Sequence, residues 1–201
     1  MKTIWNRIDS WLAANAPEIL NNLQPGATPE AIKAAEQFLE IEFPEDVKSS
    51  YRIHNGQFEE SYSVMPYGHF LCLEGMIREW NSWKKLLDTG DFNEEDGNDY
   101  GCASDGLIRT ELWWNPKWIP IASDLSGDSL CLDLDPALGG QVGQIIFMCH
   151  DDGYRGFITK SWREWLEQLA TDLEAGKYTA ISRFMEYGCK GLSTILVSAW
   201  D

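Results

Sequence analysis

The chain has 201 residues, 44% of them apolar, and ten Trp residues, which is enough for one domain with a substantial core. Its formal net charge of -16 argues against nucleic acid and anionic membranes as partners, because both are polyanions. The five Cys residues are odd in number and show no CxxC spacing, so a disulfide framework is not expected.

The N-terminal segment has no apolar core of the kind that a signal peptide carries, and no apolar run reaches membrane-spanning length. We therefore expect a cytoplasmic protein. The acidity serves solubility in many proteins, and it would also attract a basic partner. The sequence does not indicate an oligomeric state.

The first half of the chain carries helical patterns. Apolar residues at helical spacing predict a helix over 3–15, Thr28-Pro29-Glu30 begins a second, and Pro44-Glu45-Asp46 begins a third. The segment His54-Asn55-Gly56 is interpreted as the stop of that third helix, with Asn55 or Gly56 in the left-handed conformation. A short strand is expected at 70–73 and a helix over 74–87. Residues 91–106 are acidic and contain three glycines, which predicts a mobile surface loop.

The stretch from Trp118 to Pro136 predicts the centre of the fold. An apolar run at 118–122 and an alternating segment at 129–133 flank an Asp-rich turn, as in a β-hairpin. A third strand is expected over 144–149 and an edge strand over 154–158. Thr159 or Ser161 caps a helix from Trp162 to about residue 175. In the tail, 181–185 is predicted to continue a helix and 195–197 to form a strand.

This order of elements predicts an α+β fold, a single domain with a mostly antiparallel central sheet flanked by helices. We expect an N-terminal helical extension over 1–24, the domain itself over 25–178, and a C-terminal extension over 179–201 that packs on the domain.

Acidic residues of the central stretch suggest two kinds of chemistry. The spacing of Asp124, Ser126 and Asp128 resembles the start of a calcium loop, but Gly127 stands at the fourth position instead of the sixth. A turn in which Asp side chains bond to local backbone is the favoured interpretation. Asp133 and Asp135 fall on one strand face ~7 Å apart, as an acid pair for hydrolysis would. Nothing else in the sequence marks an active site.

The three His residues are isolated in the sequence, so no zinc site is predicted. Cys149 and His150, with Asp151, suggest a nucleophile and base, but neighbouring residues of a strand point to opposite faces. The glycine-rich segment 139–143 leads into a strand and lacks the helix N-terminus that binds phosphate. We therefore expect no catalytic residue, no cofactor and no metal.

Trp113 and Trp114 are adjacent, so a strand or turn would point them in different directions. One of the two is then exposed beside acidic loops and is a candidate contact anchor. Burial of both under the acidic loop is the alternative.

Several segments together resemble the SUKH superfamily, which contains a fungal cell-wall-synthesis regulator and bacterial immunity proteins against polymorphic toxins. Residues 44–46 and 51–57 resemble its proline-acid helix and the following Asn-Gly, and Ser161-Trp162 begins a segment similar to its closing helix. The resemblance covers roughly residues 25–178. Its core motifs fall on Asn55, Gly56, Trp118, Pro120, Gly127, Asp128, Asp133, Asp135, Pro136 and Gly143.

The resemblance implies an α+β domain that binds a protein and does not catalyse. The function expected first is an immunity protein that holds and neutralises a bacterial toxin, such as a nuclease or deaminase with a basic surface. Glu94, Glu95, Asp96, Asp99, Trp113 and Trp114 are its candidate contact residues. The alternative is an interaction scaffold or regulator of cell-wall or envelope synthesis. An acid-pair hydrolase comes third.

Overall fold

The structure is a computed structural model of the whole chain, and it describes all residues except 59–61, 67, 94–99, 105, 186–190 and 199–201. For 182–185 and 191–198 it describes the backbone alone. No helix in the described part of the chain is both long and apolar enough to cross a membrane.

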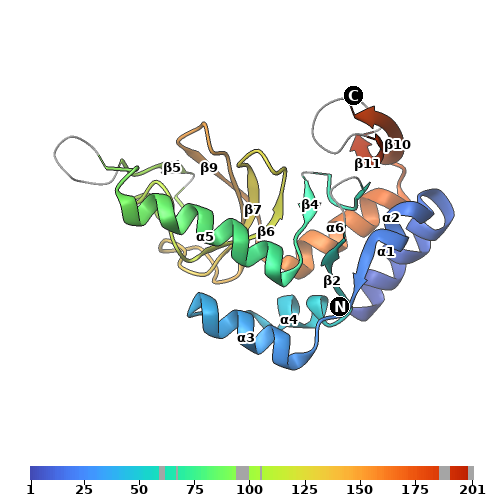
Figure 1. The fold of residues 1–201 in the computed structure, drawn as a ribbon, viewed down its shortest axis with the longest axis horizontal. Helices are drawn as coiled ribbons and strands as arrows, with labels where there is room; N and C mark the ends of the chain where they lie inside the picture. The colour runs from blue at the N-terminus through green and yellow to red at the C-terminus, as the bar shows by residue number, and fades with distance from the viewer. Residues whose placement is uncertain (59–61, 67, 94–99, 105, 186–190, 199–201) are drawn as a thin grey trace.

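A six-stranded sheet forms the centre of the molecule (Figure 1). Its order is β4 (His69–Phe70), β6 (Trp118–Ser123), β7 (Ser129–Asp133), β8 (Gln144–Met148), β9 (Tyr154–Thr159) and β5 (Ala103–Ser104). The strands from β4 to β9 pair antiparallel, and β5 pairs parallel with the first two residues of β9. The predicted α+β class and central hairpin are confirmed, whereas β9 is covered at one end and is not a full edge strand.

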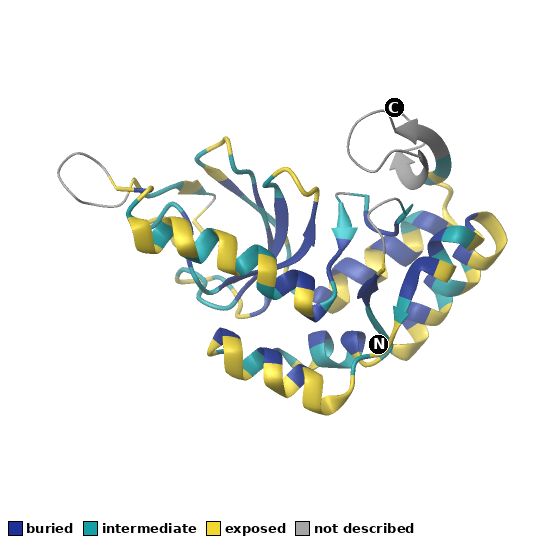
Figure 2. Cartoon of the chain, in the orientation of Figure 1, coloured by how far each residue is buried: buried dark blue, intermediate teal, exposed yellow. Residues whose placement is uncertain are grey.

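The alternation of side chains along the strands gives the sheet two buried faces (Figure 2). Leu132 and Ile145 belong to the main core, together with α1 (Lys2–Asn15), α4 (Glu45–Tyr51) and α6 (Trp162–Glu174). Cys131 and Ile146 point to the other face, where α5 (Leu73–Thr89) supplies Trp80 and Trp83. Both faces of the central strands are covered, so these strands are nearly continuous apolar runs in the sequence.

The remaining elements connect and flank these layers. They are α2 (Pro17–Asn22), β1 (Leu23–Pro25), α3 (Pro29–Leu39), β2 (His54–Gln57), β3 (Tyr62–Ser63), β10 (Tyr178–Met185) and β11 (Gly191–Ser198). Helix α3 begins as predicted, because the Thr28 side chain accepts a bond from the N–H of Ala31. Ser161, and not Thr159, caps α6 by accepting from the N–H of Glu164.

The interpretation of 54–56 as a helix stop is wrong. Helix α4 already ends at Tyr51, and His54–Gln57 forms β2, which pairs antiparallel with β1. Gly56 does have a positive φ of 73°, and a Cβ there would lie 2.2 Å from the backbone N of Cys72. The glycine is therefore needed for a close approach of two backbones and not for ending a helix. Asn55 instead accepts a bond from the N–H of Leu73 at the start of α5.

Two further expectations need correction. Residues 181–185 belong to β10, which pairs antiparallel with β11, and β11 pairs parallel with β3, so the predicted helix there is wrong and the predicted strand at 195–197 is right. The segment 91–106 is not a plain loop, because Phe92 is buried and Ala103–Ser104 is a strand. The proposed domain boundaries stay a prediction.

Candidate functional site

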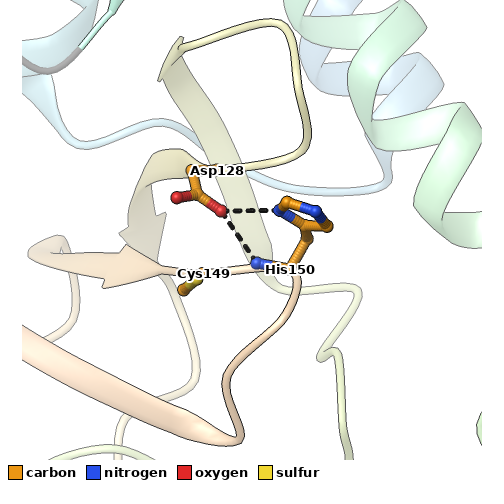
Figure 3. A group of neighbouring side chains, drawn as sticks. All are labelled: Asp128, Cys149 and His150. Atoms are coloured by element: carbon orange, nitrogen blue, oxygen red, sulfur yellow. Dashed lines mark hydrogen bonds and ion pairs between the residues drawn. The ribbon is translucent and has the colours of Figure 1, made fainter.

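Two turns lie side by side at one end of the central sheet, and they bring one side chain of the first turn next to two neighbouring residues of the second. Figure 3 shows Asp128, Cys149 and His150, whose ligand atoms all lie within 4.8 Å of one another. Oδ1 of Asp128 accepts from the backbone N–H of His150 at 2.9 Å and lies 2.8 Å from its Nδ1. We call these three residues the DCH cluster.

The first of the two turns is built by Asp124 and a glycine. Oδ1 of Asp124 accepts from the N–H groups of Ser126 and Asp128 at 2.8 and 2.9 Å, which confirms the predicted Asp turn. Gly127 has a φ of 124°, and a Cβ on it would lie 2.7 Å from Cγ of His150. Only a glycine therefore lets the imidazole pack against this turn.

The second turn is fixed by Arg155, whose side chain is fully buried. Its guanidinium donates to the carbonyl oxygens of Cys149 at 3.1 Å and Trp113 at 2.9 Å, and also to that of Asp152. Its Cζ lies 4.9 Å from the centroid of the Trp113 ring. Arg155 thus fixes the backbone of this turn at Cys149 and Asp152, on either side of His150 and Asp151.

Charge is unevenly placed around the DCH cluster. The hydrogen bond with Asp128 raises the pKa of His150, and the carboxylates of Asp151 and Asp124 add to this effect. Burial works against ionisation of Asp128, but the bonds from the backbone and ring of His150 outweigh it and lower the pKa of the carboxyl. Nε2 of His150 lies 3.1 Å from Oδ1 of Asp151. The imidazole of His150 therefore lies close to the carboxylates of Asp128, Asp151 and Asp124.

The prediction that Cys149 and His150 point to opposite faces of a strand is wrong, because β8 ends at Met148 and the alternation ends with it. The Cys149 thiol and an oxygen of Asp128 lie within 4.8 Å of each other, and the thiol helps to lower the pKa of this carboxyl. Sulfur, nitrogen and oxygen donors in this arrangement suit binding of a cation better than nucleophilic catalysis.

An apolar groove of about 420 Å³ adjoins the cluster on the α6 side of the sheet. Leu130, Phe147, Cys149, Asp152, Tyr154, Gly156 and Ile158 line it, and we call it the β9 groove. Cys149 belongs to both the groove and the DCH cluster. Tyr154 and Ile158 are 44% and 38% exposed, large values for apolar side chains on a strand. The sequence predicts an edge strand over 154–158, but alternation alone does not reveal that Tyr154 and Ile158 stay this exposed.

A second, more open hollow of about 650 Å³ lies between α3 and the loops after β7. A few apolar residues line it together with three glutamates and two lysines. The charged residues are Glu36, Glu40, Glu42, Lys33 and Lys117. The amine of Lys117 already donates to the carbonyl of Glu40 at 2.8 Å. The mixed charges offer no single ligand chemistry.

The predicted contact residues are not assembled into a surface by the described part of the chain. Trp114 is 1% exposed and stacks against Trp83 at 6.4 Å, so of the two residues it is not the exposed one. Trp113 is half-buried beneath Arg155. Glu94, Glu95, Asp96 and Asp99 lie outside the described residues.

The two candidate catalytic acids make separate contacts. Asp133 is fully buried, and its carboxylate accepts from the N–H of Asp135 at 3.0 Å and from Nε2 of Gln144 at 2.8 Å. Burial raises the pKa of Asp133 to about 6. Asp135 is half-exposed and pairs with Nε of Arg109 at 3.0 Å. One acid is enclosed and the other is occupied at the surface, which does not fit an acid pair around a substrate.

The other motif residues lie where the chain is tightly packed. Trp118 and Pro120 are buried in β6. Gly143 has a φ of 91° and donates its N–H to the carbonyl of Asp133 at 2.8 Å. A Cβ on Gly140 would lie 2.7 Å from Cβ of Pro136, so the loop after β7 is also closely packed.

Residues 26–168 match the SMI1 / KNR4 family (SUKH-1). The chain belongs to this family. The predicted resemblance is therefore confirmed, and the match spans the central sheet, the DCH cluster and most of α6.

Three curated relatives of this SUKH-1 chain have similar names. The first is "Cell wall biosynthesis/cell cycle regulator smi1" of Schizosaccharomyces pombe, 28% identical over 87% of this chain and 36% of its own length. The second is "Glucan synthesis regulatory protein" of Neurospora crassa, 28% identical over 87% of this chain and 38% of its own. The third is "Cell wall assembly regulator SMI1" of Saccharomyces cerevisiae, 26% identical over 91% of this chain and 42% of its own. The chain thus spans about two fifths or less of these relatives.

These names overturn the function expected first. The relatives are regulators of cell-wall and glucan synthesis and are not bacterial toxin immunity proteins, so the immunity prediction is wrong. They agree with the alternative, a regulator of cell-wall synthesis. The implication of toxin neutralisation came from another branch of the superfamily, which shares the scaffold.

Proposed function

We propose that this chain is a non-catalytic protein-binding domain that acts in the regulation of cell-wall synthesis. The observation that carries the proposal is its membership of a family whose matching relatives are named as regulators of that process. The β9 groove is the binding surface that the geometry favours, because its floor is apolar and its rim contains exposed Tyr154 and Ile158.

The chemistry of the partner follows from the charge of the chain. Asp152 lines the groove, Asp151 stands next to it, and the whole chain carries -16. We infer that the partner presents an apolar side chain flanked by Lys or Arg. The apolar part would fill the groove, and the basic part would be attracted to the rim and speed association.

A domain exchange in yeast tests the proposal. The matching region of the S. cerevisiae regulator is replaced by this chain, while the remainder of that protein is retained. We expect the chimera to restore growth of a strain lacking the regulator under cell-wall stress. Ile158→Asp and Tyr154→Asp in the chimera should abolish that rescue, because a carboxylate in the groove opposes an apolar side chain.

The matched control is Leu138→Asp, at a fully exposed apolar residue outside the groove. Equal protein levels of all chimeras are checked by immunoblot. A chimera that accumulates normally but gives no rescue would contradict the proposed function. Rescue by the groove variants would place the binding surface elsewhere.

A further inference from the structure

We propose that the DCH cluster is a binding site for a zinc-class divalent cation, with Oδ1 of Asp128, Sγ of Cys149 and Nδ1 of His150 as protein ligands. One ligand atom of each residue lies within 4.8 Å of those of the other two, and Oδ1 of Asp128 and Nδ1 of His150 are 2.8 Å apart. Zinc holds such ligands at about 2.0–2.3 Å in a tetrahedron, whose ligand atoms are then roughly 3.3–3.8 Å apart. A thiolate, an imidazole and a carboxylate suit zinc, whereas calcium and magnesium prefer oxygen ligands alone.

A second carboxylate, that of Asp151, contacts the other nitrogen of the His150 imidazole. Asp151 Oδ1 lies 3.1 Å from Nε2 of His150, on the side of the ring opposite the cluster. If Nε2–H donates to Asp151, the lone pair of Nδ1 is free for a metal. Zinc-bound histidines in proteins commonly have such a carboxylate partner, which fixes the tautomer and the ring orientation.

The site is also held in place before any cation binds. Gly127 leaves the space in which the imidazole packs, since a Cβ would lie 2.7 Å from Cγ of His150. Arg155 fixes the backbone of Cys149 from behind through its carbonyl oxygen at 3.1 Å. Asp128 belongs to the other turn, 21 residues before Cys149 in the sequence. The cation would therefore join two segments that are distant in sequence.

Binding would exchange protons for the metal. The Cys149 thiol loses its proton to solvent, and so does Nδ1 of His150 where it is protonated, while no electron is transferred. The three protein ligands leave one position of a tetrahedron for water. Because Cys149 also lines the β9 groove, that position would lie near the rim of the groove.

Cobalt(II) titration of the full chain tests this proposal without a partner, so its outcome is independent of the proposed function. We expect saturation at one equivalent, with tetrahedral d–d absorption and a thiolate-to-cobalt charge-transfer band, both lost on addition of zinc. Cys149→Ser should remove the charge-transfer band. His150→Asn should weaken cobalt binding about 10-fold or more, in the range that changes around metal sites produce.

Cys72→Ser is the matched control, because it removes a thiol at the start of α5 and Ser can replace it as the N-cap. It should leave the titration unchanged. Near-UV circular dichroism confirms that each variant folds. If Cys149→Ser does not fold, Asp128→Asn is used in its place, because asparagine keeps an acceptor for the His150 N–H. An absent charge-transfer band, or one that survives Cys149→Ser, would overturn the proposal and leave the cluster as hydrogen bonds between two turns.

Discussion

At the scale of single residues, Arg155 connects segments that are far apart in the sequence. It is a buried cation, burial lowers its pKa, and its charge is met by carbonyl oxygens and by the faces of Trp113 and Trp118. A lysine has one amine where the arginine has a planar fork of donors, so it cannot reach the same set of acceptors. The residue therefore joins the segment at 113 to the turn at 149–152.

We expect Arg155→Lys to lower the free energy of unfolding by about 3 kcal/mol, the cost of disrupting a buried charged network. Urea unfolding followed by Trp fluorescence measures it. Arg163→Lys is the same change at an exposed position of α6 and should cost less than about 0.5 kcal/mol. Equal effects at both positions would show that the buried guanidinium has no special role.

Asp133 predicts a pH dependence whose sign is opposite to that of a salt-bridged carboxylate. Its pKa is raised from 3.8 to about 6 by burial, so the folded state favours the protonated form. The stability that this preference contributes is complete below about pH 4 and is lost as the pH rises through about 6.

The comparison of the wild type with Asp133→Asn isolates this effect, because asparagine keeps an acceptor for the Asp135 N–H and does not titrate. The unfolding free energy of the wild type minus that of the variant should fall by about 2 kcal/mol between pH 4 and pH 7. A difference that is constant over this range would mean that the pKa of Asp133 is not raised in the folded protein.

At the scale of elements, α6 is the helix whose start the sequence defines best. The Ser161 hydroxyl accepts from the N–H of Glu164 at 3.2 Å, and Glu164 Oε2 accepts from the N–H of Lys160 at 2.9 Å. Ser161→Ala should lower the free energy of unfolding by about 1 kcal/mol, since a helix N–H loses its partner. Ser161→Asp keeps an acceptor and should preserve stability in the same urea experiment; a loss as large as that of alanine would show that the cap does not matter.

The elements that were predictable are those with local signals. The hairpin of β6 and β7 follows from an apolar run, an Asp turn and an alternating segment, and α3 and α6 begin at recognisable caps. Apolar spacing predicts a helix over 181–185, but these residues belong to β10 because they pair with β11. The short strand β2 likewise forms through pairing with β1, and no local signal specifies such a partner.

The DCH cluster shows the same limit for a site. The sequence predicts the turn that contains Asp128, and the structure confirms it, but it predicts no contact between Asp128 and His150. Their contact depends on the register of β7 against β8, where Ser129 faces Met148. That register places residues 128 and 149 at the same end of the sheet, and it cannot be obtained from spacing along the chain.

At the scale of the whole molecule, the net charge of -16 sets the response to salt. Repulsion among like charges opposes the compact state, and salt screens it within about 10 Å at 0.1 M. We expect an increase of sodium chloride from about 0.02 to about 0.3 M, which shortens the screening length roughly fourfold, to raise the urea midpoint at pH 7.5. Near the sequence pI of about 4.5 the same salt series should have little effect. Destabilisation by salt at pH 7.5 would indicate that attractive pairs outweigh the repulsion.

The packing of His150 against Gly127 also bears on where this chain tolerates changes of length. Surface turns usually accept inserted residues, but these two turns touch each other, with Asp128 bonded to the backbone of His150. An extra residue in either turn would shift one partner past the other and separate the segments at the end of the sheet.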